Sequence, residues 1–313
     1  MNKKSKIYIA GHQGMVGSLI KEKLISLGYF NLVFAERSAL DLRDQQATIT
    51  FIKEIKPEYV FLIAGRVGGI QANIDSPGSF LYDNLMICAN VIEGSRISGV
   101  KKLIFMGSSC IYPRLSPQPM REDYLLSGSL EPTNEGYAIG KIAGLKLCEY
   151  YQKEYNTNFI SAMPSNLYGP KDSFSLKHSH VLSALIRKIH NAKTKNQDSL
   201  TLWGTGEARR EFLYNEDCVE ALIFLMHNYN SAEHINVGSG VDYSIQELAG
   251  IIKTIVGFEG EFQWDTTKPN GMPQKLMDNT KINHLGWESK TSIEGGISRT
   301  YQWFLRHVQE RES

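Results

Sequence analysis

Runs of consecutive apolar residues alternate with longer amphipathic stretches in the first half of the chain. The apolar runs predict buried strands, and the helically spaced stretches between them predict helices. Strands are expected at 7–10, 32–35, 59–64, 103–106 and 159–163, and helices at 16–27, 45–55, 80–98 and 138–155. Apolar strands separated by helices are typical of a parallel sheet covered on both faces. The pattern therefore predicts an α/β fold with a Rossmann-like, doubly wound parallel sheet.

The second half of the chain is less regular and predicts a smaller, interleaved C-terminal lobe that closes over the mouth of the sheet. Ser244 and Glu247 form a capping box for a helix that reaches Val256. A loop is expected at 164–170, with helices at 180–193, 216–227 (started by Asn215) and 291–308. We expect the sheet domain in residues 1–164 and 213–240, and the substrate lobe in residues 165–212 and 241–313.

The composition narrows the classes of protein to which the chain can belong. Hydrophobic residues make up 42% and charged residues 21% of the 313 positions, an ordinary globular balance. The 34 Lys and Arg residues against 33 Asp and Glu residues give a formal net charge of +1, which argues against nucleic-acid binding through bulk charge. No apolar run approaches the roughly 20 residues needed to span a bilayer, and none matches a signal-peptide core.

Four cysteines lie far apart and form no Cys-x-x-Cys pair. They are Cys88, Cys110, Cys148 and Cys218. This spacing matches neither a disulfide framework nor a zinc site, so no metal is expected. A reducing cytoplasm is the expected setting.

A glycine-rich turn follows the first predicted strand and opens the first predicted helix. Gly11, Gly14 and Gly17 form the pattern Gly-x-x-Gly-x-x-Gly. Glycine allows a sharp turn and a close approach to a pyrophosphate, and the helix N-terminus supplies free N–H groups. A plain tight turn is the alternative, but the position at the first strand of a parallel sheet favours a dinucleotide site.

The end of the second predicted strand carries the residues that distinguish one dinucleotide from another. Arg37 is suited to clamp a 2′-phosphate, whereas Glu36 is suited to accept from a ribose hydroxyl. Both are also compatible with solvated surface charges. We favour the phosphate, and therefore NADPH.

A second group of candidate residues follows the strand at 103–106. Ser108 and Cys110 lie just beyond its carboxyl end, where ligands of such sheets bind. Tyr137 and Lys141 are four residues apart and share one helix face, where an ammonium is expected to lower the pKa of the phenol. Such a Tyr can protonate a carbonyl oxygen as hydride arrives at carbon. The chain thus carries three motifs in a fixed order, which are a glycine loop, a Ser at a strand end and Tyr-x-x-x-Lys. This order resembles the short-chain dehydrogenase/reductase superfamily in its longer, sugar-nucleotide-modifying form.

Several further stretches resemble the GDP-L-fucose synthase family, and together they cover essentially the whole chain. They are Ala10–Gly17, Val67–Ile70, Gly107–Pro113, Leu130–Glu135, Tyr137–Leu147, Asn166–Pro170, Ser179–Val181, Lys268–Gly271 and Lys275–Asp278. The chain departs from the family pattern at a few positions. Gln13 stands where the family usually has an Arg that helps to hold the NADP phosphate, and Lys188 replaces a common Arg. Arg66 replaces a frequent Lys, while Gly136 and Gly140 replace the usual Pro and Ala.

The resemblance implies an enzyme with two chemistries in one site. The substrate would be a GDP-linked 4-keto-6-deoxy sugar, GDP-4-keto-6-deoxy-D-mannose, and the product GDP-L-fucose. Cys110 and His180 would act as the acid–base pair that epimerises sugar carbons 3 and 5. NADPH would then reduce carbon 4, with Tyr137 protonating the oxygen, Ser108 holding it and Lys141 tuning Tyr137. The family also implies a homodimer, paired through the helices at 80–98 and 138–155.

Two sets of binding residues complete this expectation. Cofactor contacts are expected from Gly11, Gln13, Gly14, Met15, Val16, Gly17, Arg37, Ala64, Lys141, Pro164, Asn166 and Leu167. Substrate contacts are expected from Ser109, Asn166, His180, Val181, Lys188, Trp203, Arg210 and Lys275, with Arg209 a rival to Arg210.

Alternative functions differ in how well the residues fit them. Another GDP-4-keto sugar, such as a 6-deoxyheptose or the colitose precursor, remains open because loops shape the sugar pocket. A sugar-nucleotide dehydratase carries an acidic pair where this chain has Ser109 and Cys110. A non-catalytic dinucleotide sensor typically lacks the Tyr and the Lys, both of which are present here.

Overall fold

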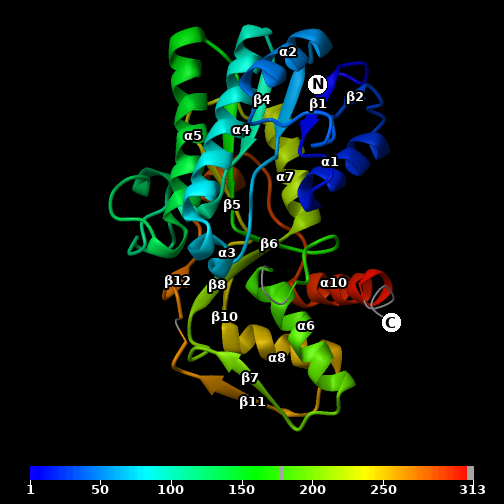
Figure 1. The fold of residues 1–313 in the computed structure, drawn as a ribbon, viewed down its shortest axis with the longest axis vertical. Helices are drawn as coiled ribbons and strands as arrows, with labels where there is room; N and C mark the ends of the chain where they lie inside the picture. Colours follow the sequence, from blue (N-terminus) through cyan, green and yellow to red (C-terminus); the bar gives the residue numbers. More distant parts are fainter. Residues whose placement is uncertain (176–178, 269, 309–313) are drawn as a thin grey trace.

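A six-stranded parallel sheet forms the larger lobe of the molecule, seen in the upper part of Figure 1. The computed structural model describes residues 1–175, 179–268 and 270–308. The strand order is β2-β1-β3-β4-β5-β9, and each neighbouring pair is parallel. The strands are β1 (Ile7–Ala10), β2 (Leu32–Val33), β3 (Tyr59–Leu62), β4 (Lys102–Met106), β5 (Phe159–Pro164) and β9 (Ile235–Val237). The predicted α/β fold with a Rossmann-like sheet is confirmed.

Five long helices cover the two faces of this sheet. They are α1 (Met15–Ser26), α2 (Gln45–Ile55), α4 (Pro77–Ile97), α5 (Glu135–Tyr155) and α7 (Asn215–Asn228). A short helix that the sequence pattern did not predict, α3 (Ile70–Asp75), precedes α4. The four predicted helices of the first half are present, with ends that move by up to three residues. The second predicted strand is shorter than expected, because only Leu32 and Val33 pair with β1.

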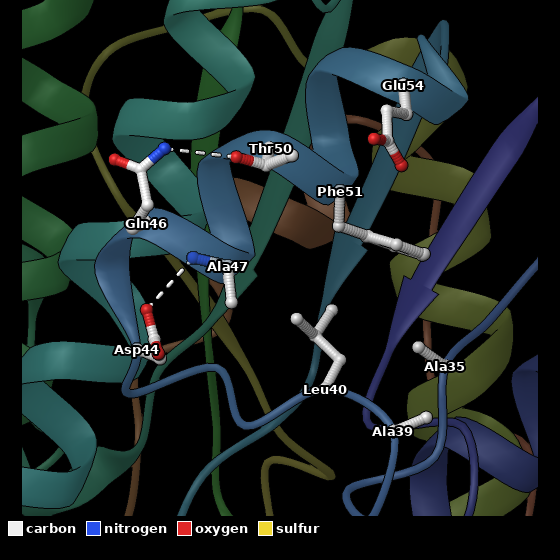
Figure 2. A pocket seen from close by; sticks show the side chains of 9 residues that line it. All are labelled: Ala35, Ala39, Leu40, Asp44, Gln46, Ala47, Thr50, Phe51 and Glu54. Atoms are coloured by element: carbon white, nitrogen blue, oxygen red, sulfur yellow. Dashed lines mark hydrogen bonds between the residues drawn. The ribbon is translucent and has the colours of Figure 1, made fainter.

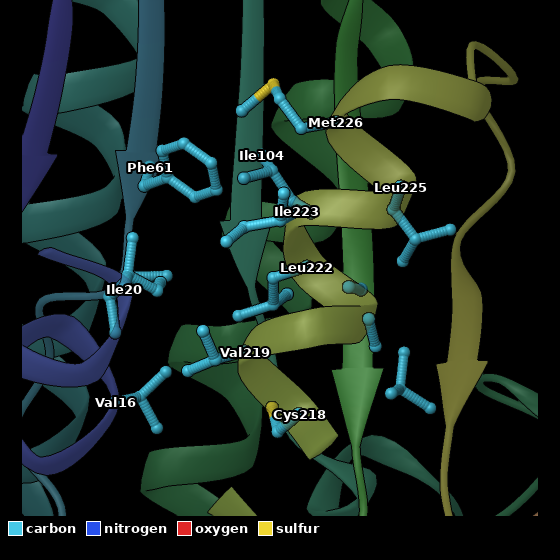
Figure 3. Close-up of a cluster of buried hydrophobic side chains, with 14 of the residues drawn as sticks. Val16, Ile20, Phe61, Ile104, Cys218, Val219, Leu222, Ile223, Leu225 and Met226 are labelled. Atoms are coloured by element: carbon cyan, nitrogen blue, oxygen red, sulfur yellow. The ribbon is translucent and has the colours of Figure 1, made fainter. Parts of the chain in front are cut away.

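Alternation of side chains along the strands divides the core between the two faces. Ile7 and Ile9 of β1 pack with α1 and α7, whereas Tyr8 of the same strand belongs to the cluster on the opposite face. Figure 3 shows the first cluster, in which Val16 of α1 and Val219 of α7 lie over the sheet. Because both faces are buried, the strands are mostly apolar, as the sequence pattern predicted, although β4, β5 and β9 each carry one buried polar residue.

The smaller lobe is built around β8 (Arg209–Tyr214), which pairs with three other short strands. These are β6 (Asn166–Tyr168), β10 (Asp242–Ser244) and β12 (Gln274–Lys275). A separate pair joins β7 (Ser199–Trp203) and β11 (Glu261–Asp265). Helices α6 (Val181–Thr194), α8 (Ile245–Val256) and α10 (Ile293–His307) contribute to the core of this lobe.

Three predictions for the second half need correction. The loop expected at 164–170 contains β6, which three residues are too few to reveal as a periodic pattern and which depends on pairing with β8. Asn215 does not cap α7 but is its first residue, and its side chain donates to the Pro170 carbonyl. The last helix begins at Ile293, after Ser292 as its cap. The capping box of Ser244 and Glu247 is confirmed.

The chain returns to the larger lobe near its end. Helix α9 (Thr280–His284) packs beside β9, and Ile282 and Trp287 join the core around α1 and α7. Met120 and Met277 form an isolated bridge between distant segments. The division of the chain into a sheet domain and a substrate lobe stays a prediction. In the part of the chain that the structure describes, no helix is long and apolar enough to cross a membrane.

The capping box gives a stability prediction. Replacing Ser244 with Ala removes the acceptor for the Glu247 amide and should lower the free energy of unfolding by about 1 kcal/mol. Thr254→Ala is the matched control, because its exposed hydroxyl only donates back to the Gly250 carbonyl. Urea unfolding measures both variants. An unchanged midpoint for Ser244→Ala would show that the cap adds nothing to stability.

Candidate active site

The glycine-rich turn has the geometry of a phosphate-binding loop. Gly11 has a φ of +94°, and a Cβ at this position would lie 2.7 Å from the backbone nitrogen of Ala64. A Cβ on Gly17 would lie 2.1 Å from the carbonyl oxygen of Gly11. The Gly14 cap has no side chain, so the first amides of α1 have no side-chain partner. Free amides at a helix N-terminus fit a pyrophosphate, and this cradle therefore fits a dinucleotide.

The residues expected to read the 2′-phosphate lie in the turn after β2. Glu36 and Arg37 are both exposed there. Arg43 lowers the pKa of Asp41 to about 2 through a hydrogen bond, and the charge of Arg37 contributes to this effect. No salt bridge holds Arg37 within the described residues, so its guanidinium is available to a phosphate.

A surface cavity of about 490 Å³ adjoins the same turn (Figure 2). It lies between the loop after β2 and the helix α2, and Ala35, Leu40 and Phe51 are among its lining residues. None of the predicted cofactor-binding or catalytic residues lines it. The cavity therefore lies beside the candidate site and takes no part in its geometry.

The carboxyl end of β4 brings Ser108 and Cys110 to the mouth of the sheet. Ser108 caps the short 3₁₀ helix Ser109–Ile111, and its hydroxyl oxygen accepts from the Cys110 amide at 3.3 Å. The Cys110 sulfur accepts from Lys275 Nζ and from Asn134 Nδ2, each at 3.3 Å. Residues from three distant segments thus converge on one thiol.

The environment of Cys110 favours the thiolate. Burial by itself would raise the pKa of Cys110, but the charge of Lys275, the Ser108 hydroxyl and the donated hydrogen bonds bring it below the usual value. Burial raises the pKa of Cys88 to about 11 and that of Cys218 to about 12, and it raises the pKa of Cys148 as well. Cys110 is therefore the one cysteine of the four whose surroundings increase its acidity.

Tyr137 and Lys141 lie one turn apart on α5, as predicted, but their ionisation differs from the expectation. Lys141 is 3% exposed, and its Nζ donates to the Met106 carbonyl at 2.9 Å. Burial lowers the pKa of Lys141 to about 8. Burial also raises the pKa of Tyr137, with a further rise from the charge of Cys110 that the Ser108 hydroxyl opposes. The expected acidification of Tyr137 is therefore not found, because burial has the largest effect on its pKa, and the phenol stays protonated as a proton donor requires.

His180 forms no hydrogen bond with this cluster in the described part of the chain. It is exposed at the N-cap of α6, and its side chain makes no capping hydrogen bond. Burial raises the pKa of Asp172, while the Ser183 hydroxyl and the charge of His180 oppose that rise. Within the described residues, no hydrogen bond joins His180 to Cys110. The pairing of His180 with Cys110 stays a prediction.

The residues expected to hold the nucleotide lie on the smaller lobe. Trp203 is 60% exposed, and Lys188 Nζ lies 5.2 Å from its ring centroid. Lys268 Nζ lies 5.7 Å from the centroid of the same ring. Val181, the residue after His180, is also exposed. Ordinary core packing therefore does not account for the position of Trp203. Pro269, in the Lys268–Gly271 stretch, lies outside the described residues.

The two candidate arginines on β8 have different partners. Arg209 forms salt bridges with Asp242 and Glu247. Arg210 donates to the backbone carbonyls of Arg209 and Asn270, and no carboxylate pairs with it among the described residues. Burial lowers the pKa of Arg210, and the charges of Glu131 and Cys110 offset this effect only in part. Arg210, rather than Arg209, therefore has a guanidinium free to bind a diphosphate.

The remaining predicted residues frame this edge of the sheet. Ser109 and Pro164 are buried, and Asn166 of β6 donates to the Glu211 carbonyl at 2.8 Å. The described residues contain no cluster of His, Cys, Asp or Glu that would hold a metal ion. Sequence reasoning missed Asn134, whose contact with Cys110 has no periodic signal because it joins two short 3₁₀ segments that are 24 residues apart.

A glycine loop on the first strand of a parallel sheet, with Ser108, Tyr137 and Lys141 at its carboxyl edge, defines a short-chain dehydrogenase/reductase. The sequence profile of the NAD dependent epimerase/dehydratase family matches residues 7–238, and the chain belongs to this family. Within it, the chain is 52% identical over 305 residues to a GDP-L-fucose synthase from Sinorhizobium fredii, with 97% of each chain covered.

Solved structures with the same fold include two reductases from Campylobacter jejuni. One is a GDP-6-OMe-4-keto-L-xylo-heptose reductase, with a TM-score of 0.93, 40% identity, and 98% and 99% of the two chains covered. The other is a GDP-mannoheptose C4 reductase with NADP bound, with a TM-score of 0.90, 40% identity, and 97% and 99% covered.

The glycine loop gives a prediction for cofactor binding. Gly17→Ala places a methyl group against the Gly11 carbonyl, so the loop must shift, and NADPH should bind about tenfold more weakly, the equivalent of roughly 1.4 kcal/mol. Gly14→Ala is the control, because its Cβ would lie 3.5 Å from the same oxygen, an ordinary contact. Fluorescence titration with NADPH measures both. Equal dissociation constants would contradict the role given to this close approach.

Proposed function

We propose that the protein is a bifunctional epimerase/reductase that converts GDP-4-keto-6-deoxy-D-mannose to GDP-L-fucose with NADPH. The observation that carries the proposal is the convergence of Ser108, Cys110, Tyr137 and Lys141 at one edge of the sheet. The likeness at 52% identity to a GDP-L-fucose synthase supports the substrate. The likeness at 40% identity to a reductase with NADP bound supports the cofactor.

The cofactor would be held along the carboxyl edge of the sheet. Gly11, Gly14 and Gly17 form the cradle for its pyrophosphate, and Arg37 would bind its 2′-phosphate in a chain that carries Gln13 in place of Arg. The bound cofactor supplies hydride for carbon 4 of the sugar. The other expected contacts are Met15, Val16, Ala64, Lys141, Pro164, Asn166 and Leu167.

The reductive half of the reaction depends on a protonated phenol. Tyr137 donates its proton to the oxygen on carbon 4, and burial keeps this proton on the phenol until a stronger base forms. Ser108 holds the same oxygen by hydrogen bonding. Lys141, with a pKa of about 8, carries its positive charge near neutral pH and favours the phenolate left after proton transfer.

The epimerising half depends on acid–base chemistry beside the ketone. Protons on carbons 3 and 5 are acidic because the resulting enolate spreads its charge onto the carbonyl oxygen. Cys110 and His180 would remove a proton from one face and return one on the other. The surroundings of Cys110 lower its pKa and so increase the share of the thiolate, which is the form that can accept a proton.

The nucleotide would be bound by the smaller lobe. Arg210 offers an unpaired guanidinium to the diphosphate, and Trp203 with Lys188 offers an exposed aromatic face and a cation. Ser109, Asn166, His180, Val181 and Lys275 complete the expected substrate contacts. A related GDP-4-keto sugar is the alternative substrate, supported by the likeness to the heptose reductases, but their 40% identity is lower than the 52% of the GDP-L-fucose synthase.

We also propose a homodimer in the cytoplasm. Helices α4 and α5 lie side by side on one face of the sheet, and Tyr82, Leu85 and Ile139 on these helices are exposed. An exposed apolar face on two adjacent helices suits pairing with the same face of a second copy. The four free cysteines suit a reducing compartment.

The function is tested by turnover in deuterated water with NADPH and GDP-4-keto-6-deoxy-D-mannose. The expected product is GDP-L-fucose with deuterium at carbons 3 and 5, because protons at both positions exchange with solvent before reduction. NMR locates the deuterium. Cys110→Ser should abolish exchange while NADPH still binds. Product without deuterium would leave a simple reductase, and turnover only with a heptose or colitose precursor would establish the alternative substrate.

The role of Tyr137 gives a separate prediction. Tyr137→Phe should slow NADPH oxidation by a factor of about 10² or more, because the phenolic proton is lost while the ring remains. Tyr150→Phe is the control, since this Tyr is exposed near the far end of the same helix. Steady-state absorbance of NADPH measures both. Near-normal turnover of Tyr137→Phe would remove Tyr137 from the mechanism.

A further inference from the structure

Lys275 occupies an unusual position for a residue expected to bind a nucleotide. It ends the two-residue strand β12, is only 7% exposed, and directs Nζ to within 3.3 Å of the Cys110 sulfur. A diphosphate-binding lysine usually keeps its ammonium at the ligand surface and relies on a long, flexible stem. Here the ammonium is held inside the site and points at a thiol.

Among the residues that the structure describes, no carboxylate competes with the Cys110 thiol for the Lys275 ammonium. Within the described residues Lys275 takes part in no salt bridge. The nearest acidic residue along β8, Glu211, is already engaged by the backbone N–H groups of Gly240 and Met277, at 2.8 and 2.9 Å. A buried ammonium without a carboxylate needs another anionic partner. The sulfur of Cys110 is the atom at hydrogen-bond distance.

The strand register strengthens this requirement. Lys275 is the direct register partner of Arg210 in the parallel pair of β12 and β8. Two cations opposite each other on adjacent strands repel, so an anion near them is stabilised. Arg210 turns toward the carbonyl of Asn270, whereas Lys275 turns toward Cys110. The two cations therefore point to different parts of the site, Lys275 to the thiol and Arg210 away from it.

Asn134 supplies a second, neutral donor to the same sulfur. Its Nδ2 lies 3.3 Å from Cys110 Sγ, just before α5 begins. Its Oδ1 is buried and has no hydrogen-bond partner among the described residues. The amide is thus oriented by the bond that it donates to sulfur, and an acceptor with a negative charge strengthens such a bond.

The other charged and titratable groups around Cys110 come from α5 and β8. Lys141 and Tyr137 interact with it electrostatically from α5, and Arg210 does so from β8. Lys141 donates to the Met106 carbonyl, and within the described part of the chain it forms no hydrogen bond to a sulfur atom. Lys275 is the one cation of this group with a recorded hydrogen bond to the thiol.

We propose that Lys275 and Asn134 are positioning residues that hold Cys110 as a thiolate aimed at the sugar, so that Lys275 serves the base rather than the GDP. The proposal rests on the role given to Cys110 in the proposed epimerisation. When the thiolate removes a proton from carbon 3 or 5, the proton passes to Sγ and the electron pair of the C–H bond enters the enolate. The negative charge moves from sulfur to the substrate, beside the same ammonium.

The test measures the thiol directly and requires no substrate. The intact protein is alkylated with iodoacetamide over a range of pH, and mass spectrometry follows the peptide that contains Cys110. Only the thiolate reacts, so the rate reports ionisation. Lys275→Met should slow alkylation at neutral pH by about tenfold, because the pKa of Cys110 rises and the curve of rate against pH shifts to higher pH. Lys275→Arg should restore most of the wild-type profile, because it keeps the charge.

A matched variant separates this contact from a general effect of charge. Lys193→Met removes a lysine of the same lobe whose Nζ donates to the Val256 carbonyl instead of to Cys110, so its alkylation profile should remain that of the wild type. Asn134→Leu should shift the profile in the same direction as Lys275→Met, and by less, because it removes a donor but no charge. Circular dichroism confirms that each variant is folded.

Each outcome bears on one claim only. Wild-type alkylation in Lys275→Met would overturn the positioning role, whatever the enzyme proves to catalyse. A shifted profile together with GDP binding as tight as in the wild type, measured by calorimetry, would support it. If Lys275→Met loses GDP binding while its alkylation profile stays that of the wild type, the proposal is overturned and Lys275 binds the nucleotide instead. Failure of solvent exchange in the wild type would count against the proposed function and leave the thiol measurement intact.

Discussion

The parallel pairing of the central strands is the constraint on which the site depends. Because β1, β4 and β5 run in the same direction, their carboxyl ends meet at one edge. The glycine turn after β1 and the segment Ser108–Cys110 after β4 therefore face the same space. Turns that leave this rigid edge carry the glycine cradle, Ser108 and Cys110 and fix their positions. Helix α5 and the strands β8 and β12 supply the other polar groups of the site.

Close helix packing adds the second half of the catalytic cluster. Helix α5 carries Tyr137 and Lys141, and its contact with α4 is the most extensive between any two elements of the described structure. A Cβ on Gly140 would lie 3.0 Å from Cβ of Asn84, which is tighter than ordinary contact. The departure from the usual Ala at this position thus has a physical reason, since glycine lets the two helices approach. That approach places Lys141 beneath the sheet edge, where its ammonium reaches the Met106 carbonyl.

Burial acts in opposite directions on the groups that meet here. It keeps the phenol of Tyr137 protonated and lowers the pKa of Lys141 to about 8, whereas the donors around Cys110 overcome burial and favour the thiolate. A proton donor and a proton acceptor can therefore coexist within one site near neutral pH. One environment then suits both proton exchange beside a ketone and protonation of the ketone oxygen.

The sequence by itself determined the sheet, its helices and most of the candidate catalytic residues, because apolar runs, glycine spacing and Tyr-x-x-x-Lys are local patterns. It could not reveal β6 or β12, which are too short to show a period and depend on pairing with β8. Nor could it place Lys275 and Asn134 on Cys110, since these contacts join segments 165 and 24 residues apart. Burial reversed the expected ionisation of Tyr137. Such effects arise only when distant segments exclude water from one another, and the tertiary structure alone decides them.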